Sequence, residues 1–423
     1  MNNRVVITGL GVVAPNAIGK KSFLQALKNQ INGITFHQDL ANKSFSCQVA
    51  GTPQVNSNLL NHYFTALEQK GLLASGLIYG GIAGQEAWLD AGLEINKSTD
   101  YDTGVIFGTG ILGVEKLKEA FNQIENQKVR RLGSTSVLQT MASGVSAFLG
   151  GKLGCGNWVT SNSSACTTGT EAFLMGYEHL KLNKAKRMLV GSSSDSGALV
   201  WGGFEALRIL PYQFNQHPEE ASRPMSKNAQ GFVPSSGAGA LVLETLDSAL
   251  ERQAPIYAEV CGGAINSGGQ RQGGSMTAPN SEAVQKCILQ SLSNAKVNAA
   301  EIDTINGHLT GTAMDAVEIN NWHSALNLND EKFPLINSLK SHIGHALAAA
   351  GSLELVASVL QVKHQFVFGN RNLQPIHPDI LNQISKKSIP NQSQSTSIKY
   401  LIKASFGFGD VNACTVLKQF KNE

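Results

Sequence analysis

The chain has 423 residues, 42% of them hydrophobic, and its formal net charge is only +3. This length allows about two to four domains with sizeable cores. No apolar run reaches the ~20 residues that cross a bilayer, so we expect no membrane span, and the small net charge does not predict binding to nucleic acid. The six cysteines lack metal-type spacing and the N-terminus lacks signal-peptide features, so we expect reduced thiols and a cytoplasmic location.

Strand-like apolar runs alternate with helical patterns along the chain. The runs are residues 5–8, 104–108, 188–191, 240–243, 256–261, 304–305, 335–336 and 414–417. This alternation predicts an α/β protein with mixed sheets. Residues 248–255 have the composition of a helix end followed by a connector, which places a domain boundary near the middle of the chain.

Cys166 lies between a short run readable as a strand (157–165) and a run with helical character (167–184). A thiol at this junction is at a helix N-terminus, where free N–H groups and the helix dipole favour the thiolate. The same N–H groups can hold a developing oxyanion. We therefore predict that Cys166 is a nucleophile for acyl transfer, with a buried structural cysteine as the alternative.

Three glycine-bearing motifs lie downstream of Cys166: residues 306–312 (NGHLTGT), 337–354 (NSLKSHIGHALAAAGSLE) and 405–412 (SFGFGDVN). In order and spacing, the four pieces resemble the β-ketoacyl-acyl-carrier-protein synthases, most closely the elongating type II enzymes. The resemblance extends from residue 4 to residue 416, which is nearly the whole chain. Any one of these motifs alone would be a weak signal.

The resemblance implies a thiolase fold, in which two similar α/β halves stack as five layers (αβαβα). Residues 1–254 would form the half with the nucleophile, and residues 255–423 the half with two histidines and a gating loop. The implied reaction is a decarboxylating Claisen condensation of an acyl-enzyme thioester with malonyl-acyl-carrier-protein. It would give 3-oxoacyl-acyl-carrier-protein in fatty-acid or polyene/polyketide-like elongation.

The resemblance also implies roles for residues of the three motifs. His308 and His345 would assist decarboxylation of the malonyl extender and stabilise its enolate, as neutral imidazoles that donate Nε2–H. Lys340 would be the active-site lysine with Glu354 as its ionic partner, in an orienting role. Residues 405–409 are expected to form a flexible turn, with a β-hairpin that packs two phenylalanines as the alternative. Phe408 would be the gate over Cys166, and its backbone N–H the second oxyanion donor beside that of Cys166. The remaining histidine of the second motif, His342, is expected to be peripheral.

Two further segments resemble parts of the family that line the acyl tunnel. They make Ile111 and Phe204 candidates for control of chain length, with ordinary core packing as the alternative for each. Leu112 stands where relatives usually have glycine, so it would narrow or redirect the tunnel.

The resemblance implies an acyl carrier protein as partner. Arg130, Arg131 and Arg208 fall near docking positions of the family and would contact this acidic carrier, although solvated surface charge is the alternative. Substrates would be carried on its phosphopantetheine, and we expect neither a metal nor another cofactor. A homodimer and a heterodimer with a related ketosynthase-like subunit both remain open.

Several positions depart from the family pattern. Residues that replace expected charges or glycines are Ser226, Ala229, Gln230, Ser236, Leu309 and Asp410. Asp410 would restrict the gating loop, and its charge would pair with a nearby cation or repel an acidic ligand. Catalytic groups are kept while their surroundings change, which favours a specialised pathway over housekeeping synthesis.

Two other functions compete with the condensing enzyme. The first is a non-catalytic or chain-length-setting subunit of a ketosynthase heterodimer, which the presence of Cys166, His308 and His345 argues against. The second is a CoA-dependent thiolase with Cys414 as its second cysteine, which the two-histidine pattern and Lys340 fit poorly. A dinucleotide site at residues 8–11 (TGLG) lacks the full glycine pattern.

Overall fold

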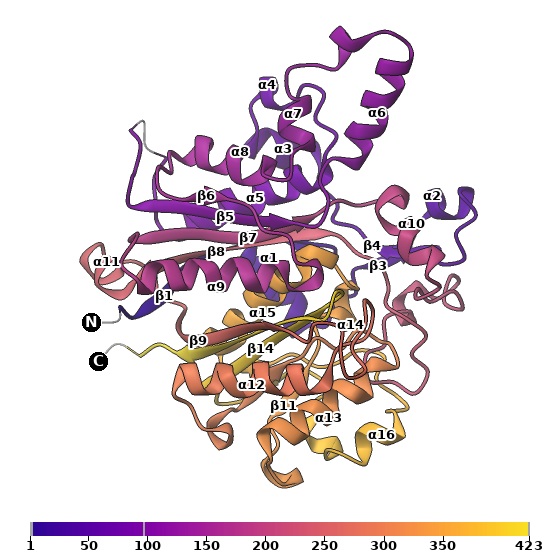
Figure 1. The fold of residues 1–423 in the computed structure, drawn as a ribbon, viewed down its shortest axis with the longest axis vertical. Coiled ribbons are helices and arrows are strands. Elements are labelled where there is room, and N and C mark those ends of the chain that lie inside the picture. The colour runs from indigo at the N-terminus through magenta and orange to yellow at the C-terminus, as the bar shows by residue number, and fades with distance from the viewer. Residues whose placement is uncertain (1–2, 96–97, 422–423) are drawn as a thin grey trace.

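A long sheet runs through the protein and consists of two halves joined edge to edge (Figure 1). The structure is a computed structural model that describes residues 3–95 and 98–421. In spatial order the first half has β6 (Val159–Thr160), β5 (Thr103–Thr109), β7 (Arg187–Ser194), β8 (Gly237–Thr245) and β1 (Val5–Ala14). The second half continues with β9 (Ala258–Ser267), β15 (Val411–Gln419), β14 (Tyr400–Gly407), β10 (Thr304–Asn306) and β11 (Leu335–Asn337).

The two halves share one topology. In each half the first strand of the sequence pairs antiparallel with the last strand, which pairs antiparallel with the strand before it. Two parallel strands then complete each half. This repeated order shows a duplication that periodicity in the sequence does not reveal. The boundary predicted between residues 254 and 255 falls between α11 (Leu246–Glu251) and β9, and it stays a prediction.

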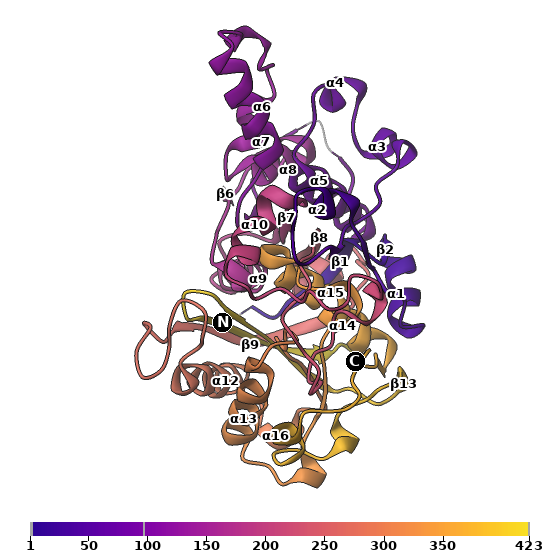
Figure 2. The ribbon, with the colours of Figure 1, turned by 90° about the vertical axis from the view of Figure 1, so that its right-hand side faces the viewer.

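Helices cover both outer faces and fill the space between the halves (Figures 1 and 2). On the outer face of the first half lie α5 (Ser75–Asp90) and α8 (Gly144–Leu153). Between the halves lie α9 (Thr168–Lys181) and α15 (Ala350–His364), and on the outer face of the second half lie α12 (Ser281–Ala295) and α13 (Met314–Leu326). The predicted five-layer α/β architecture is therefore confirmed.

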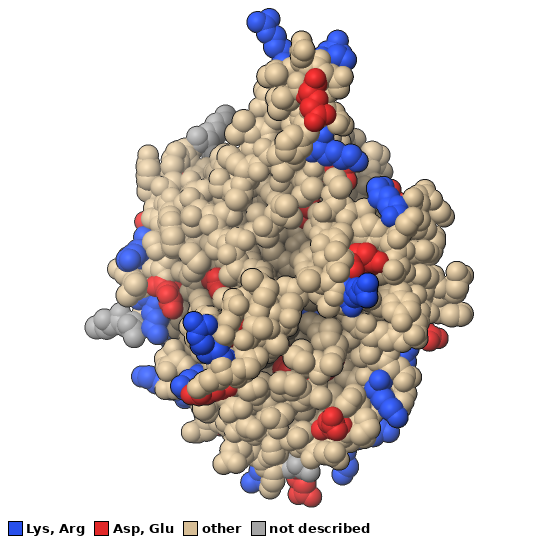
Figure 3. Space-filling model, turned by 45° about the vertical axis from the view of Figure 1, so that its right-hand side comes forward, with Lys and Arg blue, Asp and Glu red and all other residues tan. Residues whose placement is uncertain are grey.

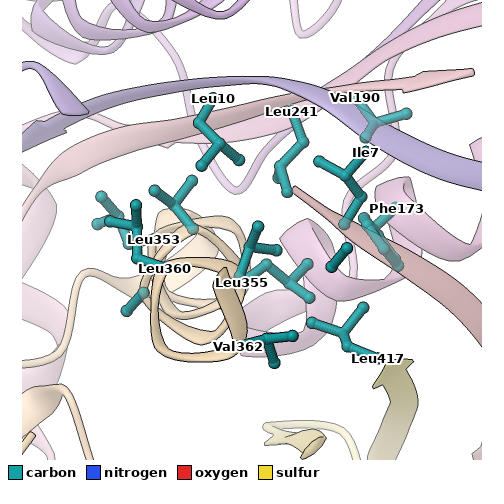
Figure 4. Close-up of a cluster of buried hydrophobic side chains, with 14 of the residues drawn as sticks. Ile7, Leu10, Phe173, Val190, Leu241, Leu353, Leu355, Leu360, Val362 and Leu417 are labelled. Atoms are coloured by element: carbon teal, nitrogen blue, oxygen red, sulfur yellow. The ribbon is translucent and has the colours of Figure 1, made fainter. Parts of the chain in front are cut away.

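The central layer holds a large hydrophobic cluster that involves both halves (Figure 4). It combines side chains of α15, such as Leu353, with Phe173 of α9, Leu241 of β8 and Leu417 of β15. Every residue of α15 from position 350 to position 362 is buried, so the helix has no solvent-exposed face along these positions. The packing fixes the N-terminal ends of α9 and α15 in the middle of the protein.

All eight apolar runs predicted as strands lie in or overlap strands of the structure. The strand predicted at 157–165 is shortened to β6, and the helix predicted at 167–184 begins as the 3₁₀ turn η2 (Ala165–Thr167) and ends at Lys181. Strand β14 was not among the predicted runs, because residues 405–409 were interpreted as a flexible turn with a β-hairpin as the alternative; the structure has the hairpin, in which β14 pairs with β15. All six cysteines are free thiols, as predicted.

The remaining α-helices and strands, with the 3₁₀ turn that carries two of the arginines, are β2 (Ala17–Ile18), α1 (Lys20–Lys28), β3 (Ile34–Phe36), α2 (Gln38–Asn42), β4 (Val49–Gly51), α3 (Ser57–Tyr63), α4 (Ala66–Gln69), α6 (Val114–Glu125), η1 (Val129–Arg131), α7 (Ser136–Thr140), α10 (Ala198–Ala206), α14 (Lys340–Ile343), β12 (Phe366–Val367), α16 (Pro378–Leu381) and β13 (Gln394–Ser395). Among the described residues, no helix combines the length and the apolar character that a bilayer-crossing segment needs.

Candidate active site

Cys166 lies in the 3₁₀ turn that leads into α9. The preceding residue, Ala165, has a φ of 48°, a left-handed conformation that costs energy for a residue with a side chain. The end of β14 comes so close that a Cβ on Gly407 would lie 3.2 Å from the backbone nitrogen of Cys166. The strained turn therefore presents the thiol at a helix N-terminus, beside the hairpin that carries Phe408.

The state of the Cys166 thiol differs from the prediction. Burial raises its pKa to about 11, although Lys340 and the backbone N–H groups of Phe408 and Cys166 act in the opposite direction. The helix end alone was expected to favour the thiolate, but removal of the sulfur from water outweighs it. The resting thiol is therefore protonated near neutral pH, and the two N–H groups point toward Sγ.

His308 follows β10 and His345 precedes α15, and the structure brings them together. Their ring centroids are 5.3 Å apart at an interplanar angle of 84°. The Nδ1 atom of His345 accepts a hydrogen bond from the backbone N–H of Leu347 (3.0 Å), and that of His308 lies 3.3 Å from the Lys340 ammonium. Since both Nδ1 atoms face donors, both rings carry their proton on Nε2.

Both imidazoles are neutral at physiological pH. Burial and, second, the charge of Lys340 lower the pKa of each ring well below its usual value. The rings therefore match the expected state, two N–H donors without charge. His342 lies elsewhere: its Nδ1 is 3.0 Å from the hydroxyl of Ser341 and its ring contacts Phe368.

A buried charge cluster supports the histidines. Lys340 contacts Glu354 directly and donates to the backbone carbonyl of His308 (2.6 Å). Sequence reasoning missed a second lysine, Lys403 of β14, whose Nζ is 3.0 Å from the other carboxylate oxygen of Glu354. Lys403 also donates to Thr170 Oγ1 at 2.8 Å, one helical turn after Cys166. One carboxylate thus serves two buried ammonium groups.

The turn that carries His308 is held by a carboxylate. Glu318 of α13 accepts the backbone N–H groups of His308 and Leu309, both at 2.7 Å, and the indole N–H of Trp322. Burial raises the pKa of Glu318 to about 7. Leu309, one of the predicted departures from the family pattern, is itself fully buried and fills the core behind the site.

Two cavities meet at the thiol. One, of about 220 Å³, is the entrance cavity, which is lined by His308, His345 and residues such as Thr277 and Pro279. The other, of about 290 Å³, is enclosed mainly by apolar side chains. Cys166, Phe204, Leu347 and Phe408 line both. Phe408 therefore lies where a gate between an entrance and an apolar chamber would be needed.

The predicted tunnel residues have different positions. Ile111 and Phe204 line the apolar cavity, and the ring of Phe204 lies 6.1 Å from that of Phe408. Leu112 does not line it: this side chain is buried in the core, where a Cβ on Gly76 or Gly144 would touch it. The Leu112 side chain therefore fills the core of the first half and does not narrow the apolar cavity directly.

The three arginines predicted to dock a carrier do not form one cluster. Arg130 and Arg131 lie in η1, after the projecting helix α6, whereas Arg208 follows α10 (Figure 1). Arg208 is exposed and adjoins Ile209, which lines the entrance cavity. On the face shown in Figure 3, positive and negative side chains alternate over a largely uncharged, hollowed surface.

The three central groups have ligand atoms close enough for a metal. Within the described parts of the chain, Cys166, His308 and His345 place one ligand atom each within 4.8 Å of the others. Thiolate and imidazole are ligands that Zn²⁺ prefers. A metal here would occupy the nucleophile and both N–H donors, so metal binding and acyl transfer would exclude each other.

This fold and site define a thiol-dependent acyltransferase. The family model "Beta-ketoacyl synthase, N-terminal domain" matches residues 2–249, and "Beta-ketoacyl synthase, C-terminal domain" matches residues 257–374. The chain therefore belongs to the β-ketoacyl synthase family.

Relatives resemble the chain over its whole length. The 3-oxoacyl-[acyl-carrier-protein] synthase 1 of Buchnera aphidicola is 29% identical over 99% of this chain and 100% of its own length. The chloroplastic synthase I of Arabidopsis thaliana is 32% identical over 99% of this chain and 87% of its own.

Solved structures of ketosynthases have the same fold as this chain. A β-ketoacyl synthase from Burkholderia phymatum has a TM-score of 0.89 at 25% identity, over 99% of this chain and 100% of its own. A complex of a type II polyketide acyl-carrier protein with its ketosynthase bound to the hexaketide gives 0.88 at 28% identity, with the same coverage. The predicted thiolase fold is thus confirmed.

Proposed function

We propose that the chain condenses an acyl group held on Cys166 with malonyl-acyl-carrier-protein, with loss of carbon dioxide. The product is 3-oxoacyl-acyl-carrier-protein, two carbons longer than the acyl group. The observation that carries this proposal is the meeting of one thiol and two neutral Nε2–H imidazoles at the junction of two cavities. Such a site suits thioester chemistry, because the thiol accepts acyl groups and the imidazoles stabilise oxyanions.

In the first half-reaction the sulfur of Cys166 attacks an acyl-phosphopantetheine thioester. A new C–S bond forms to Cys166, the old C–S bond breaks, and the proton lost by Cys166 is balanced by the one gained by the leaving thiol. The backbone N–H groups of Cys166 and Phe408 hold the oxyanion. The acyl chain enters the apolar cavity past Phe204 and Phe408.

In the second half-reaction malonyl-phosphopantetheine occupies the entrance cavity. Its carbon–carbon bond to the carboxylate breaks, carbon dioxide leaves, and the electron pair forms an enolate at the thioester oxygen. His308 and His345 donate Nε2–H to this oxygen without carrying charge. The enolate carbon attacks the acyl carbonyl, the bond to the Cys166 sulfur breaks, and the thiolate regains a proton from water.

Peptide mass mapping after incubation with acyl-acyl-carrier-protein tests the proposal. We expect the acyl group on Cys166, and 3-oxoacyl product once malonyl-carrier is added. Labelling of a different cysteine, or none under conditions of turnover, would sink the assignment. The intact masses of products from a panel of acyl chains would also show the chain length used.

The competing functions are not favoured. A non-catalytic subunit would not need Cys166, His308 and His345 assembled at one cavity. A thiolase would need a second cysteine there, but Cys414 is fully buried in β15 and lines neither cavity.

Carrier docking is proposed at Arg208 and at the pair Arg130 and Arg131. The support is the exposed position of Arg208 beside the entrance cavity and the carrier complex solved for a 28% identical ketosynthase. Reversal of these charges should raise KM for carrier substrates and weaken its salt dependence, with little effect on small thioester mimics. Equal losses on both substrate kinds would contradict docking.

We propose a dimer, either of two copies or with a related subunit. The support is the apolar surface left exposed at the β6 edge of the sheet, where Trp158 and Val159 are 41% and 38% exposed. Native mass measurement distinguishes the two assemblies.

Phosphopantetheine on the carrier supplies the thioester, so the proposed chemistry needs no bound metal or cofactor. The cytoplasmic location stays a prediction, since the curated relatives include a chloroplastic enzyme.

A further inference from the structure

Asp410 occupies the turn between β14 and β15, two residues after Phe408. It is 1% exposed and has a φ of 63°, a left-handed conformation that Asp adopts more readily than most residues. Burial of a carboxylate is costly unless hydrogen bonds satisfy it. The sequence suggested pairing with a cation or repulsion of a ligand, and the structure shows a different arrangement.

The carboxylate of Asp410 is bound by the loop that connects β9 to α12, residues 268–280. Its Oδ2 accepts the backbone N–H of Gln270 at 2.9 Å, and its Oδ1 accepts that of Asn280 at 2.8 Å. The backbone carbonyl of Asp410 accepts the N–H of Gly268 at 2.9 Å. One residue of the gating turn thus binds two residues at the start of the loop and one at its end.

Two glycines make room for this carboxylate. A Cβ on Gly268 would lie 2.2 Å from Asp410 Oδ2, and a Cβ on Gly274 would lie 2.5 Å from the same atom. Real Cβ atoms do not approach so closely. The loop is therefore shaped around the Asp410 side chain, because only glycine at positions 268 and 274 leaves room for the carboxylate.

The loop has few other attachments. In the described structure, the hydrogen bonds that connect residues 268–280 to distant parts of the chain all go to Asp410 or to Gly409, whose N–H donates to the carbonyl of Met276. The loop is mostly exposed. It nevertheless contributes Thr277 and Pro279 to the cavity that contains His308 and His345.

We propose that Asp410 is a positioning residue that fastens the 268–280 loop to the turn carrying Phe408, so that gate and cavity entrance move as one unit. The proposal rests on the proposed function, because it assigns the loop to the entrance for malonyl-carrier. If Phe408 swung away alone, the carboxylate would lose its donors while still shielded from water, which is unfavourable. The exposed loop has little else to hold it and can follow the turn.

The first test measures amide hydrogen exchange in the full-length protein. In Asp410→Gly, we expect the amides of Gln270 and Asn280 to exchange about fivefold faster or more, since each loses a hydrogen bond worth roughly that factor. Asp410→Asn keeps one acceptor oxygen and should be intermediate. Glu282→Gln, which removes an exposed carboxylate at the start of α12, serves as the control and should leave these amides unchanged.

The second test uses the predicted clash. Gly274→Ala should speed exchange in the loop when Asp410 is present, because the added methyl displaces the carboxylate. In the Asp410→Gly background the same change should have a clearly smaller effect, since the 2.5 Å clash is gone and the next contacts, at 3.0 Å, are tight but less severe. Equal effects in both backgrounds, or unchanged exchange in Asp410→Gly, would overturn the proposal.

The third test separates positioning from a purely structural tie. If gate and entrance move as a unit, Asp410→Gly should release more carbon dioxide per 3-oxoacyl product than the wild type, by about twofold or more, because decarboxylation is no longer timed with closure. If carbon dioxide and 3-oxoacyl product fell in proportion while the loop amides exchanged faster, Asp410 would only hold the loop in place. That result would overturn its positioning role. Acyl labelling of wild-type Cys166 is measured alongside. Its absence would count against the proposed function, whereas the exchange results would still decide whether Asp410 fastens the loop.

Discussion

Replacement of Lys403 by methionine is the sharpest test of the buried charge cluster. The Lys403 ammonium is fully buried, lies 3.0 Å from Glu354 Oε2 and donates to the hydroxyls of Thr170 and Ser405. Methionine fills a similar volume without charge, and the two hydroxyls keep their mutual hydrogen bond of 2.9 Å. The main loss is therefore the ion pair at Glu354 Oε2.

The expected size follows from these contacts. Removal of one partner of a buried ion pair costs about 3–5 kcal/mol. Glu354 keeps Lys340, and a buried ammonium no longer has to be desolvated, so we expect the free energy of unfolding to fall by only about 1–3 kcal/mol. Glu354→Gln should cost more than Lys403→Met, because it leaves both ammonium groups without their counter-charge.

The same change should alter the pH dependence of catalysis. The charge of Lys403 contributes to the lowered pKa of His308 and His345. Its removal makes protonation of the rings easier, so their pKa rises and the acid limb of malonyl decarboxylation moves to higher pH. Urea unfolding and a decarboxylation profile measure both effects, with exposed Lys363→Met as control. An unmoved acid limb together with unfolding within about 0.5 kcal/mol of wild type would refute the reasoning.

Three further predictions concern the thiol and the histidines. Alkylation of Cys166 by iodoacetamide should keep rising with pH beyond 8, because burial raises the thiol pKa to about 11; a plateau near pH 7, absent in Cys166→Ser, would contradict this. His308→Ala and His345→Ala should each retain acyl labelling but lose malonyl decarboxylation by about 100-fold or more, since each removes an oxyanion donor; wild-type decarboxylation rates would refute the assignment. Burial lowers the pKa of His342 to about 3, while the unfolded side chain titrates near ~6.5. Between these values the unfolded state binds the extra proton, so stability falls as pH falls, by up to ~1.4 kcal/mol per pH unit for this residue. His342→Asn should flatten the slope of unfolding free energy against pH by that amount, and an identical slope would show that His342 does not titrate this way.

The sequence predicted the α/β class well because its short apolar runs alternate with helical patterns, while the five-layer fold came from the family resemblance. Strands such as β5 and β7 are buried on both faces, and their local sequences carry that information. The missed strand, β14, ends in Ser405 and Gly407, residues that favour turns locally but are paired with β15 in the structure. Tertiary pairing with β15 decided between the flexible turn and the β-hairpin that was its alternative.

Residues of the site were predicted where motif spacing in the sequence identifies them. Features that depend on burial in the folded structure were missed. Cys166, His308 and His345 were found from motifs, and the structure brings them together, while their roles stay predictions. Lys403 was missed because nothing near it in sequence indicates that it meets Glu354. The direction of the Cys166 pKa was wrong because a helix end is visible in sequence, whereas the depth of burial is not.

The shared central layer has a consequence for synthesis of the chain on the ribosome. The first half of the sheet is complete once β8 has been made, but one of its faces rests on α15, whose residues emerge more than a hundred positions later. At about 5–20 residues per second, this apolar face waits several seconds or more for its cover. During this interval the exposed apolar face favours association with other chains. A fragment that stops at residue 254 should aggregate, even though its own strand order is complete.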